Sequence, residues 1–312
     1  MTCLDNATKE QLASLCKEKE IPVLWEEPMK HYTSFQIGGP ASAVCIPKNR
    51  EQLSCLLSFL IKMQINHWFV GNGSNLLISD EGLKGVVILL DSDFDGEILI
   101  SNTVLEAPAG KKLSSVCAAA CRAELTGLEF AWGIPGSVGG AVYMNAGAYG
   151  GEMKDRLIWV EYLDLDGNIQ RVPAEKLNLS YRHSCFMEQE YQGVCIIRAA
   201  FSLEKGEQAA IQAEMDRIIG QRKEKQPLDL PSAGSTFKRP EGPFVGQMIE
   251  ESGLKGFSVG DAQVSDMHAG FLINNGNASC EDMLLLIHAV QDKVKEAYGV
   301  DLHTVVQIVG ED

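Results

Sequence analysis

Apolar residues along the chain recur at two spacings, one typical of amphipathic helices and one typical of strands. After Asn49, leucines recur at helical spacing as far as residue 60 and lead into the apolar segment 67–70, which predicts a helix followed by a strand. A longer apolar seam follows Ser279 and predicts a second helix. Further helices are predicted from a Thr8–Gln11 capping box and over residues 111–123 and 209–225.

Strand-like runs occupy much of the remaining chain. They cover residues 86–90, 98–100, 104–105, 158–164, 169–172, 195–202 and 302–309, and an Asp-Gly turn at 166–167 predicts that two of them form a hairpin. The segment Gly127–Gly151 carries eight of the 30 glycines. Each glycine costs a helix interior about 1 kcal/mol relative to alanine, so no helix is predicted there.

Length and charge narrow the class of protein. A chain of 312 residues favours two domains, and Pro227 and Pro231 after a charged helix place the boundary near 205–230. The net charge of −15 disfavours nucleic acid and anionic membranes as partners, so an anionic ligand needs a local cationic pocket. Apolar runs are only strand-sized and residues 1–20 do not resemble a signal peptide, which predicts a cytoplasmic protein without a membrane segment.

The nine cysteines are scattered and include no Cys-x-x-Cys pair. This pattern does not predict a metal site, and it favours reduced, mostly buried thiols that pack as small apolar side chains.

Two glycine-rich segments carry candidate chemistry. Gly71–Asn75 follows an apolar strand, where glycine lets main-chain N–H groups face an anion. It is not a dinucleotide fingerprint, because the third glycine would fall on Leu76. The second segment, Gly133–Ala141, has no Walker lysine. Two uncharged loops of this kind suit a pyrophosphate, although either one alone is also consistent with an ordinary turn or a packed structural loop.

Six blocks together resemble the UDP-N-acetylenolpyruvoylglucosamine reductase (UDP-N-acetylmuramate dehydrogenase) family. They run in order from about residue 30 to the end: Thr33–Pro40, Gly71–Leu77, Gly127–Gly151, Tyr181–Ser184, Ala233–Lys238 and Gly260–Asn274. The chain lacks the tyrosine-bearing insertion of one subtype and so resembles the shorter type II form.

The resemblance implies an α+β protein with a vanillyl-alcohol-oxidase-type (PCMH) FAD-binding fold of two subdomains and a C-terminal α+β substrate-binding domain. It implies an N-terminal helical extension (1–30), an FAD-binding region (31–205, with subdomains of about 31–90 and 91–205) and a substrate domain (206–312). Members of the family pass a hydride from NADPH through FAD to a UDP-sugar enolpyruvyl ether, giving UDP-N-acetylmuramate for peptidoglycan. The sequence does not indicate the oligomeric state.

The resemblance also assigns site residues. FAD is expected at Gly71, Asn72, Gly73, Ser74, Asn75, Leu76, Gly133, Ile134, Pro135, Gly136, Ser137, Val138, Gly139, Gly140 and Ala141. Hydride addition leaves negative charge on the substrate carbon next to a carboxylate, and Arg182 matches the arginine that faces it. Ser235 matches the serine that then protonates that carbon, and Gly234 before it is expected to allow close backbone approach. Tyr149, Lys238 and Arg239 are expected to bind substrate.

The C-terminal segment departs from the family at two functional positions. Where members typically read Leu-Glu-x-Glu-Val-Arg, this chain reads Leu302 to Gln307 with valine at the position of the catalytic glutamate, Val305, and glutamine at a cationic position. Loss of one positioned acid–base group lowers a rate on the order of 10²–10⁴-fold. Strand alternation would put His303 on the same face as Val305, which makes it a candidate substitute.

Two functions from different classes follow. The first is an FAD-dependent reductase of the UDP-enolpyruvyl sugar, slowed by Val305. The second is a flavin-binding paralogue that no longer turns over and has a binding or regulatory role. A nicotinamide-binding Rossmann dehydrogenase is disfavoured by Leu76.

Overall fold

The chain forms two compact units, each assembled from segments that are separate in the sequence. The computed structural model describes residues 4–240 and 244–310, so Cys3 lies outside the described residues. Unit 1 takes Met1–Glu26, Ser42–Asn72 and Lys84–Gly220, and unit 2 takes Glu27–Ala41, Gly73–Leu83 and Gln221–Asp312. The three-part division into 1–30, 31–205 and 206–312 stays a prediction.

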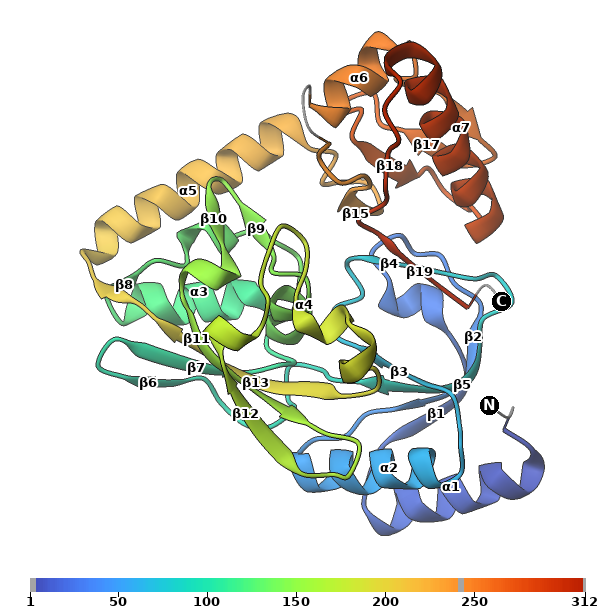
Figure 1. The fold of residues 1–312 in the computed structure, drawn as a ribbon, viewed down its shortest axis with the longest axis vertical. Helices are drawn as coiled ribbons and strands as arrows, with labels where there is room; N and C mark the ends of the chain where they lie inside the picture. Colours follow the sequence, from blue (N-terminus) through green and yellow to red (C-terminus); the bar gives the residue numbers. More distant parts are fainter. Residues whose placement is uncertain (1–3, 241–243, 311–312) are drawn as a thin grey trace. The chain divides into compact units, whose positions relative to one another are not determined.

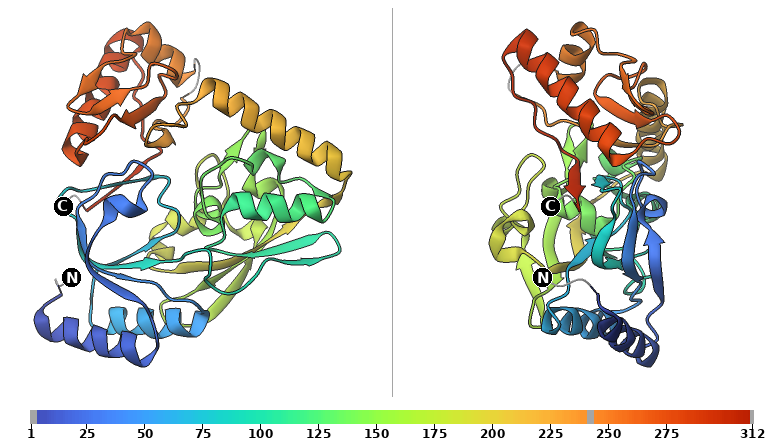
Figure 2. Two further views of the ribbon diagram at one scale, coloured as in Figure 1. Left: turned by 180° about the vertical axis from the view of Figure 1, so that it is seen from behind. Right: turned by 90° about the vertical axis from the view of Figure 1, so that its right-hand side faces the viewer.

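The first sheet of unit 1 has four strands and two covering helices. Its strand order is β1 (Val23–Pro28), β2 (Pro40–Cys45), β5 (Leu83–Leu89) and β3 (His67–Val70), with β3 and β5 parallel. Helices α1 (Asn6–Glu18) and α2 (Arg50–Lys62) lie side by side (Figures 1 and 2). Their buried leucines share one apolar core with the sheet. Asn49 caps α2 as predicted, but α1 begins at a cap formed by Asp5. The predicted Thr8 cap is therefore wrong.

The second sheet of unit 1 is antiparallel throughout. Its order is β12 (Ile169–Pro173), β11 (Leu157–Leu163), β13 (Cys195–Ser202), β7 (Val104–Pro108) and β6 (Leu99–Ser101). The remaining elements are α3 (Leu113–Arg122), β8 (Leu125–Thr126), β9 (Gly147–Ala148), β10 (Gly151–Glu152), β14 (Glu204–Lys205) and α5 (Gln208–Lys225). The predicted 158–172 hairpin and the strand from residue 195 are confirmed.

A short helix, α4 (Val138–Tyr143), occupies part of the glycine-rich segment where no helix was predicted. Tertiary packing offsets the cost of its glycines, because α4 lies against β13 and β7. The Gly139 N–H donates to Ala109 O at 2.9 Å, and a β-carbon at residue 139 would approach that of Ala109 to 3.0 Å. Only a small residue allows this close contact.

Unit 2 packs two helices on a four-stranded antiparallel sheet. The sheet order is β15 (Ser232–Ser235), β18 (Phe271–Asn274), β17 (Ala262–Val264) and β16 (Ser258–Val259). Helix α6 (Val245–Glu251) contacts α7 (Cys280–Tyr298), and α7 contacts β16 and β17. Ser279 caps α7 as its sequence predicts. A separate parallel pair joins β4 (Leu76–Ile78) to β19 (Gln307–Val309).

The C-terminal strand is shorter than predicted. Strand geometry begins at Gln307, and residues 302–306 are irregular apart from a single bridge between Thr304 and Phe237. The predicted strand over residues 302–309 is therefore confirmed only from Gln307 onward, and the shared face of His303 and Val305 stays a prediction.

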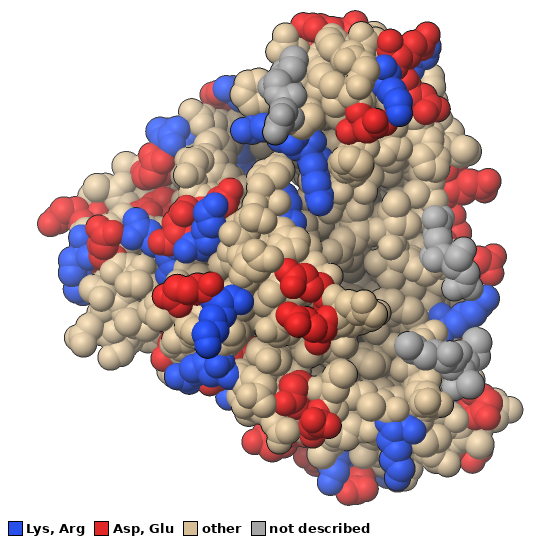
Figure 3. Space-filling model, in the orientation of Figure 1, with Lys and Arg blue, Asp and Glu red and all other residues tan. Residues whose placement is uncertain are grey.

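Surface and thiol properties follow the composition. Figure 3 shows acidic side chains mixed with basic ones over the face drawn there. Seven of the eight described cysteines are buried, and Cys55 is half-buried. Within residues 4–240 and 244–310, no helix is both long and apolar enough to cross a bilayer, and no cluster of His, Cys, Asp or Glu is arranged to hold a metal ion.

A buried ion network ties α2 to the second sheet of unit 1. Arg50 donates to both carboxylate oxygens of Asp95 at 2.8 and 2.9 Å, and Arg198 Nη2 lies 3.1 Å from the same carboxylate. Arg50 also pairs with Glu161 at 3.1 Å. The pKa of Arg50 is raised, chiefly by its hydrogen bond to Asp95. Since the Asp95 side chain is 10% exposed, the network holds four charges largely away from water.

We expect Asp95→Ala to destabilise the protein strongly. It leaves Arg198 without its carboxylate partner and Arg50 with Glu161 alone, and breaking a buried pair in this way costs about 3–5 kcal/mol. Urea unfolding followed by circular dichroism measures the loss. As the control, Glu296→Ala removes one partner of an exposed pair with Lys293 and should change the free energy of unfolding little. Equal effects of the two substitutions would contradict the prediction.

Candidate functional site

The first glycine loop follows β3 and is tied to the second within unit 1. A β-carbon at Gly71 would overlap Ser137 Oγ, so only glycine fits there. Asn72 Nδ2 donates a hydrogen bond to Pro135 O, which joins the two loops directly. The N–H groups of Gly71 and Asn72 donate to no group among the described residues. The pairing of the two predicted segments therefore leaves amides open to a ligand.

The rest of the first loop belongs to unit 2, where its residues form main-chain and side-chain hydrogen bonds. Gly73 O accepts a hydrogen bond from the Ser34 N–H at 3.1 Å. Asn75 Nδ2 donates to Val305 O at 2.9 Å, and Asn75 O accepts from the Gln307 N–H at 3.0 Å. Leu76 starts β4, where it pairs with Gln307. Ser74 is half-buried.

The second segment uses only some of its amides internally. Five N–H groups have acceptors within unit 1: those of Ile134, Val138, Gly139, Gly140 and Ala141. Three others, at Gly133, Gly136 and Ser137, donate to no group in the described ranges. Ser137 is 4% exposed, and an unpaired N–H on so buried a residue is rare in native proteins. The neighbouring Trp132 Nε1 is likewise buried and unpaired.

These unpaired donors fit the predicted FAD. A pyrophosphate is anionic and rich in acceptors, so it would satisfy main-chain N–H groups that the protein itself leaves unpaired. Val138 and Gly139 do not contribute such donors, because their N–H groups are bonded to Lys111 O and Ala109 O at 2.9 Å each. Within the second segment, the donors open to the cofactor are the amides of Gly133, Gly136 and Ser137.

We expect Gly71→Ala to weaken FAD binding by at least about tenfold. The new methyl group would push Ser137 and its loop away, and overpacking of this kind typically costs ~1–3 kcal/mol. Titration of the apoprotein with FAD, followed by quenching of flavin fluorescence, measures the change. The control is Gly220→Ala on α5, because no atom lies within 4 Å of its β-carbon position. Similar losses in both variants would contradict the role of the Gly71 contact.

Arg182 lies in a tight turn of unit 1 in a strained conformation. Its φ of +53° falls in the left-handed region, which costs a non-glycine residue about 1–2 kcal/mol. Main-chain hydrogen bonds between Ser180 and His183 close the turn. One guanidinium nitrogen, Nη2, donates to Gly147 O at 2.8 Å, and the guanidinium carbon lies 5.1 Å from the centre of the Tyr181 ring. The other guanidinium N–H groups make no hydrogen bond in the described ranges.

Asn145 holds the Arg182 turn in place, and the sequence did not identify it. Its fully buried side chain donates to Ser180 O at 2.8 Å and to Glu152 Oε2 at 2.9 Å, and accepts from the Lys154 N–H at 2.9 Å. The pKa of Glu152 is lowered, first by its hydrogen bond from Lys154, then by that from Asn145 and by the positive charges of Lys154 and Arg182. The Asn145-Ala146-Gly147 motif was visible, but its partner is 35 residues away.

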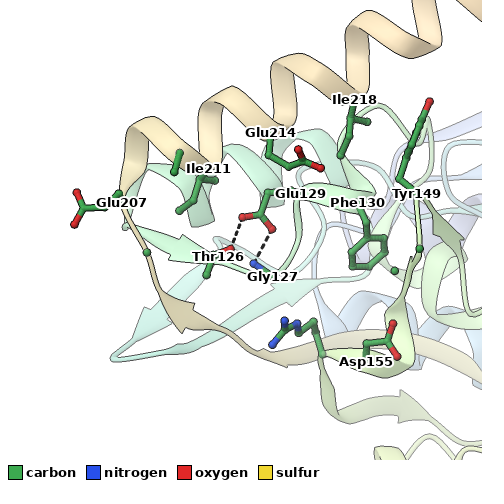
Figure 4. Close-up of a pocket in the computed structure, with 15 residues that line it drawn as sticks. Thr126, Gly127, Glu129, Phe130, Tyr149, Asp155, Glu207, Ile211, Glu214 and Ile218 are labelled. Atoms are coloured by element: carbon green, nitrogen blue, oxygen red, sulfur yellow. Dashed lines mark hydrogen bonds between the residues drawn. The ribbon is translucent and has the colours of Figure 1, made fainter.

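Tyr149 forms the tip of the β9–β10 hairpin and borders a cleft of about 600 Å³ in unit 1 (Figure 4). In Figure 4, Ile211, Glu214 and Ile218 project from α5 toward the cleft, and Phe130 lies beneath them. The charged lining is mostly acidic: Glu129, Asp155, Glu207 and Glu214 oppose Arg156 alone. Such a cleft repels a diphosphate. We therefore do not assign the diphosphate of the UDP-sugar to this cleft.

Ser235 ends β15 in unit 2, with its side chain exposed. Gly234 before it has a φ of +76°, and nothing lies within 4 Å of its β-carbon position. That position is open among the described residues, and the expected close backbone approach at Gly234 stays a prediction. Glycine also suits the left-handed turn that precedes Ser235.

Position 305 lies directly beside the Ser235 strand. The Val305 N–H donates to Thr236 O at 2.8 Å, and the Lys238 N–H donates to His303 O at 2.7 Å. Val305 is half-buried and apolar, so it brings no proton donor or charge. The Lys238 side chain is exposed, as is that of Arg239, whose guanidinium carbon lies 4.9 Å from the centre of the Phe244 ring.

Two domain families match this chain. One is the FAD binding domain, over residues 41–173, and the other is the UDP-N-acetylenolpyruvoylglucosamine reductase C-terminal domain, over residues 226–309. A UDP-N-acetylenolpyruvoylglucosamine reductase from Caldanaerobacter subterraneus subsp. tengcongensis is 47% identical over 94% of this chain and 95% of its own length. A protein of the same name from Enterococcus faecalis is 44% identical over 98% of this chain and 99% of its own.

A solved structure agrees with these sequence matches. The crystal structure of UDP-N-acetylenolpyruvylglucosamine reductase from Thermus caldophilus superposes with a TM-score of 0.77 at 35% identity, covering 92% of this chain and 98% of that one. The predicted α+β, vanillyl-alcohol-oxidase-type FAD-binding fold is confirmed by this match and by the FAD binding domain.

Proposed function

Because the chain belongs to the UDP-N-acetylenolpyruvoylglucosamine reductase family, we propose that it reduces the enolpyruvyl ether of UDP-N-acetylglucosamine to UDP-N-acetylmuramate with NADPH. It is an FAD-dependent oxidoreductase of peptidoglycan precursor synthesis. The observation that carries the proposal is near-full-length identity of 47% to a reductase, joined to unpaired amides where the cofactor is expected. We assign FAD to the region 31–205 and the UDP-sugar to 206–312, with Tyr149 as an additional substrate contact.

The chemistry that FAD would supply when bound is hydride transfer from NADPH to the substrate double bond. The amides of Gly71, Asn72, Gly133, Gly136 and Ser137 would hold its pyrophosphate. They would act as fixed dipoles, so binding would not require a cationic side chain at that point.

Arg182 binds the substrate carboxylate. Only Nη2 is engaged, by Gly147 O, so the remaining N–H groups are available to pair with the carboxylate. Hydride addition drives negative charge into this carboxylate, and the guanidinium stabilises that charge more in the transition state than in the ground state. The permanent charge of arginine suits the task at any pH in the cell.

Ser235 then protonates the substrate carbon. Its O–H bond breaks as the C–H bond forms, and solvent returns a proton to the oxygen. Lys238 and Arg239 bind the diphosphate of the substrate. Both side chains are exposed and cationic in a chain of net charge −15, which provides the local positive field that an anionic substrate needs.

A second candidate function rests on Val305 and Gln307. A scaffold that binds FAD but lacks the family glutamate is consistent with a paralogue that has a binding or regulatory role. Rapid mixing separates the two functions. In a reductase, NADPH bleaches the flavin absorbance and the UDP-enolpyruvyl sugar restores it under anaerobic conditions. Bleaching without any restoration overturns the reductase, and a protein that neither contains nor takes up FAD overturns both functions.

A further inference from the structure

The side chains of His268 and Ser235 both lie next to the β-carbon position of Gly270 in unit 2. Ser235 pairs with Phe271 across β15 and β18, and the Thr236 N–H donates to Gly270 O at 3.0 Å. The position that a β-carbon of Gly270 would occupy lies 3.4 Å from Ser235 Oγ and 2.9 Å from His268 Cε1. The missing side chain of Gly270 thus leaves a space bordered by the serine hydroxyl and the imidazole.

The imidazole is held in one orientation and one tautomer. Nδ1 accepts the Gly270 N–H at 3.1 Å, so the ring proton of neutral His268 is on Nε2. The His268 N–H donates to Ser265 Oγ at 3.3 Å, and the ring packs edge-on against Phe271 with centres 4.9 Å apart. Within the described residues, Nε2 makes no hydrogen bond, so its proton is available to a neighbour.

No carboxylate is available at the position where the family supplies one. Val305 is joined to Thr236 through its main chain, and its side chain carries only methyl groups. We propose that His268 is the positioning residue for Ser235 in this chain: Nε2–H donates to one water in the space above Gly270, and that water donates to Ser235 Oγ. This inference rests on the proposed function.

The bond has two consequences for the protonation step. It turns the proton of Ser235 away from the ring and toward the substrate carbon, and it stabilises the negative charge left on Oγ as the O–H bond breaks. His268 itself neither gains nor loses a proton, and solvent reprotonates the serine. The glutamate of other family members would make this help largely redundant.

Protonation of His268 should remove the hydrogen bond that orients its ring and so end its effect on Ser235. Burial lowers the pKa of His268 below its ordinary value of 6.5, with Lys255 lowering it further and Glu250 opposing it. Below that pKa, Nδ1 carries a proton and no longer accepts the Gly270 N–H, so the ring loses the bond that orients it. The rate of substrate reduction should therefore fall with an inflection below pH 6.5, whereas NADPH oxidation should not share that inflection.

The test is His268→Gln in two backgrounds, the natural chain and Val305→Glu, with both flavin half-reactions followed by rapid mixing. We expect His268→Gln to slow flavin reoxidation by the UDP-enolpyruvyl sugar by about 10–100-fold in the natural chain, but by only a few-fold in the Val305→Glu background. The acid inflection should disappear in His268→Gln. Gly270→Ala, whose methyl group would meet the ring at 2.9 Å, should reproduce the slowing while both titratable groups remain.

Different outcomes overturn different claims. Equal losses in the two backgrounds, equal losses in the two half-reactions, or an acid inflection that survives His268→Gln would each make His268 purely structural and overturn this inference. A natural chain that never reoxidises with the substrate overturns the proposed function and this inference with it.

Discussion

We expect Val305→Glu to raise the rate of flavin reoxidation by the UDP-enolpyruvyl sugar by about 10²-fold or more. The reason is proximity: the Val305 N–H donates to Thr236 O at 2.8 Å, so a side chain on residue 305 starts one residue away from Ser235 across the bridge. A positioned acid–base group there contributes on the order of 10²–10⁴-fold. Rapid mixing at saturating substrate measures this gain.

The half-buried setting of Val305 makes this substitution tolerable. A carboxylate there keeps contact with solvent, so it does not incur the full cost of burying a charge. Val305→Gln is the matched control, because glutamine has nearly the same shape as glutamate and does not titrate. It should give no gain. If Val305→Glu and Val305→Gln reoxidise the flavin at the same rate, the site has diverged at more positions than residue 305, and Gln307 is the next position to test.

Elements with local signals were predictable from the sequence. Helix α7 combines a Ser279 cap with an apolar seam of four residues (Met283, Ile287, Val290 and Val294), and the β11–β12 hairpin has an Asp-Gly turn between two apolar runs. In both elements, the residues that determine the local structure are neighbours in the sequence. The predictions failed where the local structure depends on a residue that is distant in the sequence. Helix α4 depends on Ala109 for close packing, and the irregular segment 302–306 is set by its bonds to Thr236 and Lys238.

The candidate site divides in the same way. Glycine loops are visible as motifs, but which amides stay unpaired depends on Ala109 and Lys111, which capture the N–H groups of Gly139 and Val138. Asn145 and His268 belong to no sequence motif that indicates their role. Asn145 becomes informative only when Ser180 is seen to accept its hydrogen bond, and His268 only when Gly270 brings it beside Ser235.

Arg182 gives the largest expected loss. In Arg182→Gln, we expect reoxidation of the flavin by the substrate to fall by about 10²–10³-fold, the range seen when one donor to a developing negative charge is removed. Flavin reduction by NADPH should change little, because the carboxylate that Arg182 binds belongs to the other substrate. Arg122→Gln, an exposed arginine at the end of α3, is the control for loss of one positive charge in unit 1.

The backbone of Arg182 distinguishes a functional role from a structural one. A residue at φ +53° would be more stable as glycine, yet this position carries arginine at a conformational cost of about 1–2 kcal/mol. Arg182→Gly should therefore leave the free energy of unfolding unchanged or higher while reoxidation falls as far as in Arg182→Gln. If instead stability and activity fall together, the bond from Arg182 to Gly147 O maintains the hairpin, and the charge on the substrate must be stabilised by another residue.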